Sequence, residues 1–407
     1  MALTRAHEAR LYDRPVTRVR QARPILGPSQ AASRGFSRER IAGIDIPSDK
    51  DIARLNFGEP CFETPKHIVD AAIAAMTGSY THYPPSHGDP ELRHAIAKRA
   101  SIRAGRRVDP TEVLVTAGAT EAIYCALTAV LDPGDEVLLF DPSYSLYAAI
   151  LNQIDAKPVY VRMTEELRPD RDQLEHAVTD RTRLLIICNP VNPTGVVFNE
   201  AELRAIAQFA VANDLLVLVD EIYDELVFTG ALSSALAITE LADRLLYVNG
   251  FSKTYAMTGW RLGYLAAPPE LLHPAHIILS NCSAGVNWPT QRAGIAALEG
   301  PQEPIAEMIA GYHARRQALI EGLAGTPGLK PITPQGTFYL YVAFNFDRRI
   351  SSAELTKLLL DEGVAVRSGT EYGPAGEGYL RLSYSAALED IRKGAERLHR
   401  VFENLTG

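Results

Sequence analysis

The chain has 407 residues, of which 46% are hydrophobic and 22% are charged, and its net charge at pH 7 is −8. This length suits two domains, or one large domain with a smaller companion, and the negative charge gives no reason to expect a nucleic acid or a membrane surface as partner. The four cysteines lie far apart and the ten histidines have no metal-ligand spacing, so we expect no disulfide framework, no metal site and a cytoplasmic location.

The first forty residues are rich in arginine, with nine Arg against three acidic residues. Such a pattern is typical of a transit peptide, and it also suits a solvated arm that lies over a partner subunit. We favour the arm. No apolar run in the chain reaches the length of a membrane span.

From about residue 64 to 300, short apolar runs alternate with amphipathic stretches. The runs have little polar alternation, which is typical of strands buried on both faces of a mainly parallel sheet. Helix starts stand between them: Thr64-Pro65 offers an N-cap with Gly78 as the end of its helix, and Asn199 precedes early acidic residues. We therefore predict a three-layer α/β/α domain over residues 64–300, with strands at 113–116, 136–140, 184–188, 215–219, 245–248 and 262–266.

The pattern changes after Pro301. A long helix is predicted over about 303–323, followed by an alternating strand over 336–344. The capping box Ser351-Ser352-Ala353-Glu354 opens another helix. Strands near 364–367 and 379–383 and a final helix from about 388 complete a small α+β domain. We predict that residues 1–63 and 301–407 form this domain, with an N-terminal arm.

The segment 249–261 carries one lysine, Lys253, and one arginine, Arg261, eight residues apart and just after a predicted strand. The chain has eight lysines against 33 arginines, so this apolar, glycine-bounded segment is an unusual place for a solubilising lysine. An amine and a guanidinium match two functional groups of pyridoxal phosphate. Its aldehyde condenses with an amine, and its phosphate pairs with arginine. Alone, such a lysine is more often a surface residue.

Two segments, one of small residues and one rich in proline, follow predicted strands at the sheet edge where open α/β sheets bind ligands. In the segment 116–121, small residues would let backbone N–H groups approach an anion at a helix N-terminus, with Thr120 as an extra donor. A tight turn explains this segment equally well. The segment 189–195 holds two asparagines between fixed prolines, which is more than a turn alone requires.

Three further polar residues occupy positions in or after strands. Asp220 ends a buried strand, where a carboxylate must be paired or its pKa rises. A protonated pyridine nitrogen would be a suitable partner, and Tyr223 could donate to the phenolic oxygen of the same ring. Arg381 stands between apolar residues of a strand. It is either a surface arginine or a bidentate clamp for a carboxylate.

These residues, in this order, resemble the fold-type I pyridoxal-phosphate aminotransferases of class I/II, the group that includes bacterial aspartate and aromatic aminotransferases. The resemblance covers about residues 55–402. It implies an enzyme of amino-acid metabolism that moves an amino group between an L-amino acid and a 2-oxo acid, and a homodimer with shared active sites. It rests on the following ordered set: Gly58-Glu59-Pro60, Tyr83, Gly88, Leu92-Arg93, Asn192-Pro193-Thr194-Gly195, Asp220, Tyr223, Ser252-Lys253, Gly259-Trp260-Arg261 and Arg381-Leu382-Ser383.

The resemblance also implies roles for single residues. Lys253 would form the Schiff base with the cofactor and act as general base, Asp220 would keep the pyridine nitrogen protonated, and Tyr223 would bond the phenolic oxygen. The other expected cofactor ligands are Gly118, Ala119, Thr120, Tyr144, Asn192, Ser252, Arg261 and, from the neighbouring subunit, Tyr83. The expected substrate ligands are Gly58, Asn192 and Arg381, of which Arg381 would bind the α-carboxylate.

The chain departs from the family pattern at Gly250, at Cys61 and at Thr120, where some bacterial aspartate enzymes have a lysine for the side-chain carboxylate. Aspartate specificity is therefore not implied. A lyase, cyclase or oxidase on the same cofactor stays open, because these reactions also begin with deprotonation of the substrate Cα. Trp288 suits either a specialised substrate pocket or an interface core. A transcriptional regulator is disfavoured, since residues 1–55 are too few for a winged helix.

Overall fold

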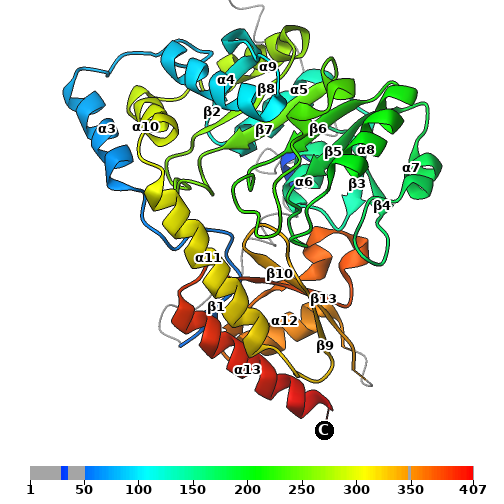
Figure 1. Cartoon of the computed structure of the whole chain (residues 1–407). Coiled ribbons are helices and arrows are strands. Elements are labelled where there is room, and N and C mark those ends of the chain that lie inside the picture. The colour runs from blue at the N-terminus through cyan, green and yellow to red at the C-terminus, as the bar shows by residue number, and fades with distance from the viewer. Residues whose placement is uncertain (1–28, 35–50, 347–349, 407) are drawn as a thin grey trace, which may run out of the picture.

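The computed structural model describes residues 29–34, 51–346 and 350–406 (Figure 1). Its larger part is built on a seven-stranded sheet in the order β2-β8-β7-β6-β5-β3-β4, in which β8 alone runs antiparallel to its neighbours. The mainly parallel α/β sheet that the sequence predicts is therefore confirmed. The strands are β2 (Val113–Thr116), β3 (Glu136–Asp141), β4 (Lys157–Arg162), β5 (Thr182–Cys188), β6 (Leu216–Asp220), β7 (Leu245–Gly250) and β8 (Gly263–Ala266).

Helices cover both faces of this sheet. Alternate residues of a strand point to opposite faces, so Val113 and Val115 of β2 belong to one core and Leu114 belongs to the other. The Leu114 core is closed by α5 (Ala119–Val130), α6 (Ser145–Gln153) and α9 (Pro269–Cys282). The opposite face packs against α4 (Pro90–Ala104), α7 (Arg171–Ala177), α8 (Glu200–Ala212) and α10 (Trp288–Glu299), with α3 (Lys66–Thr77) against α10.

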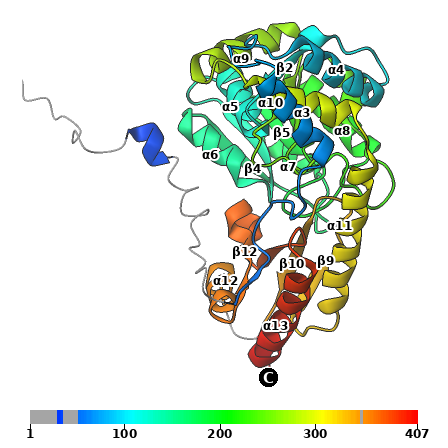
Figure 2. The ribbon, with the colours of Figure 1, turned by 90° about the vertical axis from the view of Figure 1, so that its left-hand side faces the viewer.

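A second, four-stranded antiparallel sheet lies at the other end of the molecule, in the order β12-β13-β10-β9 (Figures 1 and 2). The long helix α11 (Glu303–Gly322) runs between the two ends and packs on α13 (Leu388–Thr406). The remaining elements here are β9 (Leu329–Ile332), β10 (Tyr339–Phe344), α12 (Ser352–Asp361), β12 (Arg367–Ser368), β13 (Tyr379–Ser383) and the parallel pair β1 (Ala53–Arg54) and β11 (Val364–Ala365). The domain limits 64–300 against 1–63 and 301–407 remain a prediction.

The six predicted strands of the large sheet are present, with ends that differ by at most two residues. The sequence does not predict β4, an edge strand that carries Pro158 and is partly exposed, because proline and charge weaken a strand pattern. The predicted cap at Thr64 is wrong. The Thr64 hydroxyl donates to the Ala256 carbonyl at 2.6 Å, and Pro65 precedes α3 without a side-chain cap. Short 3₁₀ helices span 110–112, 235–237, 239–241, 369–372 and 374–376.

The arginine-rich start lies mostly outside the described residues. Of residues 1–40, only 29–34 are described, and there Arg34 pairs with Asp155 at 2.6 Å on the surface. Surface pairs of this kind stabilise a protein little, and the arm stays a prediction for residues outside the described ranges. Within the described ranges, helices long and apolar enough to cross a membrane are absent.

Candidate active site

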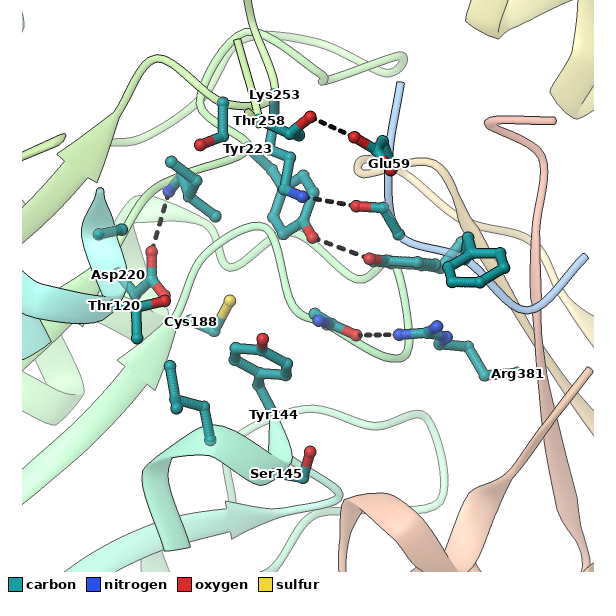
Figure 3. Close-up of a pocket in the computed structure, with 18 of the residues that line it drawn as sticks. Glu59, Thr120, Tyr144, Ser145, Cys188, Asp220, Tyr223, Lys253, Thr258 and Arg381 are labelled. Atoms are coloured by element: carbon teal, nitrogen blue, oxygen red, sulfur yellow. Dashed lines mark hydrogen bonds between the residues drawn. The ribbon is translucent and has the colours of Figure 1, made fainter. Parts of the chain in front are cut away.

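The carboxyl ends of the parallel strands meet at one edge of the large sheet, above which lies a cavity of about 440 Å³. Segments from the small sheet, including β13, close the other side of the cavity. Figure 3 shows Asp220 and Arg381 on opposite sides, with Tyr144 and Tyr223 between them. The cavity is lined by most of the predicted site residues: Gly58, Ala119, Thr120, Tyr144, Asn192, Asp220, Tyr223, Ser252, Lys253, Arg261 and Arg381.

Lys253 lies three residues beyond β7, and its amine points into the cavity (Figure 3). Its Nζ donates to the Gly58 carbonyl at 2.5 Å. Burial lowers the pKa of Lys253 to about 8, and the nearby cations Arg381 and Arg261 act in the same direction, against an opposing effect of Glu59. A substantial fraction of this amine is therefore neutral near physiological pH, which is the form that attacks an aldehyde.

Asp220 is the last residue of β6 and is buried. Its Oδ2 accepts from the Tyr147 hydroxyl at 2.9 Å and its Oδ1 accepts from the Ile222 N–H at 3.1 Å. Burial raises the pKa of Asp220 to about 6, because these hydrogen bonds and the charge of Lys253 offset the desolvation only in part. Such a carboxylate is stabilised by a cation placed against it.

Arg381 lies in β13 with only 5% of its surface exposed, so the surface interpretation of this residue is wrong. Its Nη1 donates to Asn192 Oδ1 at 3.3 Å and its Nη2 donates to the Asn56 carbonyl at 2.9 Å. The guanidinium stacks 4.0 Å from the centre of the Tyr339 ring. Its Nε is buried and finds no hydrogen-bond partner among the described residues, which leaves a donor for a bound anion.

Tyr223 follows β6 and reaches the middle of the cavity from the same strand end as Asp220. Its hydroxyl lies 3.0 Å from the Tyr339 hydroxyl, and its ring packs edge-on against Phe338. Asn192, in the buried segment 189–195, lines the same cavity and accepts from Arg381. The structure therefore brings together the two residues expected at the phenolic oxygen and the residue expected at the substrate carboxylate.

The N-terminus of α5 lies at the end of the site that suits a bound anion. Gly118 has φ +82° and precedes the helix, and a Cβ at this position would come within 2.6 Å of Arg261 Nη2. Glycine therefore lets the guanidinium approach the first amides of α5. Arg261 is held there by the Thr258 carbonyl at 2.9 Å and the Ala117 carbonyl at 3.5 Å. Backbone amides, a guanidinium and the Thr120 hydroxyl together suit a phosphate.

Pyridoxal phosphate fits this set of residues. A partly neutral amine can take its aldehyde, a buried carboxylate can face its ring nitrogen, and the cradle at Gly118 can take its phosphate. Tyr144, the expected stacking aromatic, lines the cavity as the N-cap residue of α6. Tyr83 does not line it: this side chain is 91% exposed and lies on a separate groove.

The residues near the site that were not singled out from the sequence include Tyr147, Cys188, Tyr339, Arg367 and Glu371. Tyr147 could have been found from its spacing of three residues from Tyr144 at the start of one helix, which places both near the same strand end. Arg367 and Glu371 depend on how β12 pairs with β13, and one sequence does not show that register.

The comparisons with known proteins agree with this geometry. A model of the family "aminotransferase class I and II" matches residues 50–398. The aspartate aminotransferase of Geobacillus stearothermophilus is 36% identical over 362 residues, which cover 87% of this chain and 92% of that protein. The aromatic-amino-acid aminotransferase 2 of Thermococcus litoralis is 38% identical over 360 residues, covering 86% and 92%. The solved structure of an aromatic aminotransferase from Pyrococcus horikoshii has a TM-score of 0.85 at 36% identity, covering 91% and 99%.

The chain therefore belongs to the class I and II aminotransferases, with the fold of pyridoxal-phosphate enzymes of fold type I. It is an enzyme that uses pyridoxal phosphate to transfer an amino group between an amino acid and a 2-oxo acid. The family resemblance and the fold class predicted from the sequence are confirmed. The comparisons give no support to a lyase, cyclase or oxidase.

Proposed function

We propose that Lys253 is the residue that binds the cofactor's aldehyde and then moves the substrate's proton. Pyridoxal phosphate, when bound, withdraws electrons from the substrate Cα and so acidifies its C–H bond. With the cofactor bound, Lys253 would be released by the incoming amino group, and its neutral amine would take the proton from the substrate Cα and deliver it to the C4′ carbon. Its pKa of about 8 supports both roles, because the neutral amine is the nucleophile and the base.

Asp220 and Arg381, which lie on opposite sides of the cavity (Figure 3), determine which bond of the substrate is broken. Asp220 holds a proton on the ring nitrogen, and Asn192 and Tyr223 donate to the phenolic oxygen. Arg381 would orient the substrate's α-carboxylate, so that the Cα–H bond rather than the bond to the carboxylate is presented for cleavage. Its Nε is buried and has no hydrogen-bond partner in the described part of the chain, and this donor and the contact with the Tyr339 ring support the role. Deprotonation is then favoured over decarboxylation.

We assign the remaining contacts in the same way. The amides at Gly118 and Ala119, the Thr120 hydroxyl, Ser252 and Arg261 bind the phosphate, and Tyr144 stacks on the ring. The Gly58 carbonyl, which accepts from Lys253 Nζ at 2.5 Å, lies where the substrate approaches. The observation that carries the proposal is one cavity that joins a partly neutral lysine, a buried carboxylate and two guanidiniums.

The decisive test is Lys253→Ala beside Lys66→Ala, a control at an exposed lysine on α3. Borohydride reduction of the holoenzyme, followed by peptide mapping, should place the cofactor's mass on the peptide that contains residue 253. Lys253→Ala should lose that attachment and at least about a thousandfold in rate, since one side chain supplies the covalent and the proton-transfer role. Attachment at another lysine, or activity close to that of the control, would refute the assignment.

We also propose that the enzyme is a homodimer in which Tyr83 of each subunit reaches the phosphate in the other. Tyr83 lies on a groove beside the exposed apolar side chains Ile73 and Met76, which a monomer would leave in water. Trp260 lines this groove and also a neighbouring pocket, which Arg261 lines as well. A side chain of the partner subunit therefore has a path from the groove to Arg261, where we place the phosphate.

Mixing two inactive variants tests this arrangement. Lys253→Ala subunits still carry Tyr83, and Tyr83→Ala subunits still carry Lys253. If Tyr83 acts across the interface, a hybrid dimer contains one complete site, and unfolding and refolding the mixture should recover up to about a quarter of wild-type activity by random pairing. No recovery in confirmed hybrids, or a fully active monomer in light scattering, would contradict the proposal.

We place the enzyme in the cytoplasm. All four cysteines are free thiols in the structure, and two of them, Cys125 and Cys188, are buried. Burial raises the pKa of both thiols, which keeps them protonated and unreactive. Free thiols suit a reducing compartment. Immunodetection in fractionated cells should find the protein in the cytosolic fraction, and recovery in a sealed organelle would overturn this location.

A further inference from the structure

A second arginine stands beside Arg381 at the substrate end of the cavity. Arg367 of β12 is the direct partner of Arg381 in the antiparallel pairing of β12 with β13. Directly opposed residues of an antiparallel pair project from the same face of the sheet, with their Cβ atoms about 5 Å apart. Both side chains line the cavity. The site therefore contains one more guanidinium than a single α-carboxylate needs.

Glu371 lies against this second arginine. Its Oε2 is 3.4 Å from Arg367 Nη1, and the two side chains are only 14% and 12% exposed. Burial raises the pKa of Glu371, while the charges of Arg367 and Arg381 lower it. Tyr372, the next residue, packs over the Arg381 guanidinium at 5.0 Å from the ring centre. The segment that carries Glu371 thus brings a carboxylate to both arginines.

Each cation of the cavity has a partner when cofactor and substrate are counted in. According to the function proposed above, Lys253 is consumed by the aldehyde, Asp220 faces the ring nitrogen, Arg261 the phosphate and Arg381 the α-carboxylate. Arg367 and Glu371 then neutralise each other. Among the described residues that line the cavity, this leaves Glu59, whose carboxylate is hydrogen-bonded to the Thr258 hydroxyl.

A second substrate carboxylate is disfavoured by this arrangement. It would have to displace Glu371 from Arg367 and would leave that acid in a partly dry pocket, and it would enter a space that already holds the negative Glu59. Thr120 offers a hydroxyl and no cation at the phosphate end. An uncharged side chain meets none of these costs.

We propose that Glu371 is a specificity-determining residue: by neutralising Arg367, it makes the site select substrates with one carboxylate and an uncharged side chain over dicarboxylic ones. Amino donor and amino acceptor use the same site in turn, so the selection applies to both. The amino acceptor is then a monocarboxylic 2-oxo acid such as pyruvate. It is not a dicarboxylic 2-oxo acid such as 2-oxoglutarate. This inference rests on the proposed function.

The test compares the two acceptor classes in wild type and in Glu371→Gln. The measured quantity is kcat/KM for 2-oxoglutarate divided by kcat/KM for pyruvate, with one neutral amino acid as donor. Wild type should give a ratio below one. The amide of Glu371→Gln has no charge to set against that of Arg367, so a second carboxylate is attracted more strongly to this guanidinium and the ratio should rise at least tenfold. Arg367→Gln should lower it instead, and the double variant should return it towards wild type. Glu307→Gln, an exposed glutamate of α11, is the matched control.

Binding to the holoenzyme gives a second readout that needs no turnover. Calorimetric titration with succinate and with propionate should show that Glu371→Gln gains affinity for the dicarboxylate alone. A wild type that prefers 2-oxoglutarate, or variants that change both acceptors equally, would overturn the inference. Absence of amino transfer with every donor and acceptor would instead refute the proposed function, and the two failures are thus distinguishable.

Discussion

Replacing Tyr147 by phenylalanine removes one hydroxyl from a buried pair and keeps the ring. The Tyr147 hydroxyl donates to Asp220 Oδ2 at 2.9 Å, and the second oxygen of Asp220 keeps its bond from the Ile222 N–H. A hydrogen bond to a charged group contributes about 1.5–3 kcal/mol, and a pKa unit corresponds to about 1.4 kcal/mol. Tyr147→Phe should therefore raise the pKa of Asp220, already about 6, by roughly one to two further units.

The sign of the stability effect follows from the direction of this shift. The pKa of Asp220 in the folded protein lies above its ordinary value of 3.8, so the folded state binds the proton more tightly than the unfolded chain does. Stability contributed by this group is present below pH 3.8 and is lost as the pH rises through about 6. Tyr147→Phe enlarges that loss, since the ionised carboxylate has one donor fewer. The apoenzyme variant should be less stable by about 1.5–3 kcal/mol at pH 8.5, and by only about 0.5–1.5 kcal/mol at pH 5, where Asp220 is mostly protonated.

Thermal unfolding of the apoenzyme at pH 5 and pH 8.5 measures this difference. Tyr124→Phe is a suitable control, because Tyr124 lies half-buried on α5, outside the Asp220 pair. The shift in melting temperature should be larger at pH 8.5 for Tyr147→Phe only. The variant should also release pyridoxal phosphate more readily, as followed by absorbance during dialysis. Equal destabilisation at the two pH values would show that the hydroxyl acts through packing and does not support the ionised Asp220.

Three further changes should each affect one part of the site. Gly118→Ala forces a Cβ to within 2.6 Å of Arg261 Nη2 at a backbone φ of +82°. The equilibrium dissociation constant for pyridoxal phosphate should therefore rise at least about tenfold. Unchanged binding would show that the phosphate does not bind at Gly118. The rate at which the apoenzyme captures the cofactor should increase as the pH passes through about 8, where Lys253 loses its proton, whereas a flat profile from pH 6.5 to 9.5 would contradict this. Arg381→Lys keeps the charge but loses the planar fork, and it should raise KM for the amino acid about 10- to 100-fold while the cofactor's absorbance spectrum stays as in wild type.

Much of the site could be predicted because its residues stand next to strand ends. Asp220 and Lys253 follow two buried, apolar runs, and parallel strands that neighbour each other deliver their carboxyl ends to one edge. The local pattern therefore predicts that these residues meet at one sheet edge, while their roles come from the family resemblance. The helix starting at Ala119 is a further example, since small residues after a strand indicate a helix N-terminus with accessible amides.

The half that comes from the small sheet could be predicted only in part. Arg381 has the same sequence pattern whether its strand faces solvent or the cavity, and only its packing on Tyr339 and its 5% exposure decide this. Arg367 and Glu371 are fourteen and ten residues earlier in the chain, beyond the reach of a local pattern. Their positions follow from the register of β12 on β13 and from the intervening turns, which tertiary pairing determines.

Opposite pKa shifts at Asp220 and Lys253 have the same cause. Burial disfavours both the ionised carboxylate and the protonated amine, so it raises the first pKa to about 6 and lowers the second to about 8. Under the proposed roles, a pyridinium nitrogen would supply the cation that Asp220 requires, and an aldehyde would consume the amine that Lys253 holds partly neutral. Both desolvation costs would therefore be offset by the same ligand, so that the groups which destabilise the folded protein on their own are the groups proposed to bind the cofactor. The site's affinity and its reactivity both derive from the same burial.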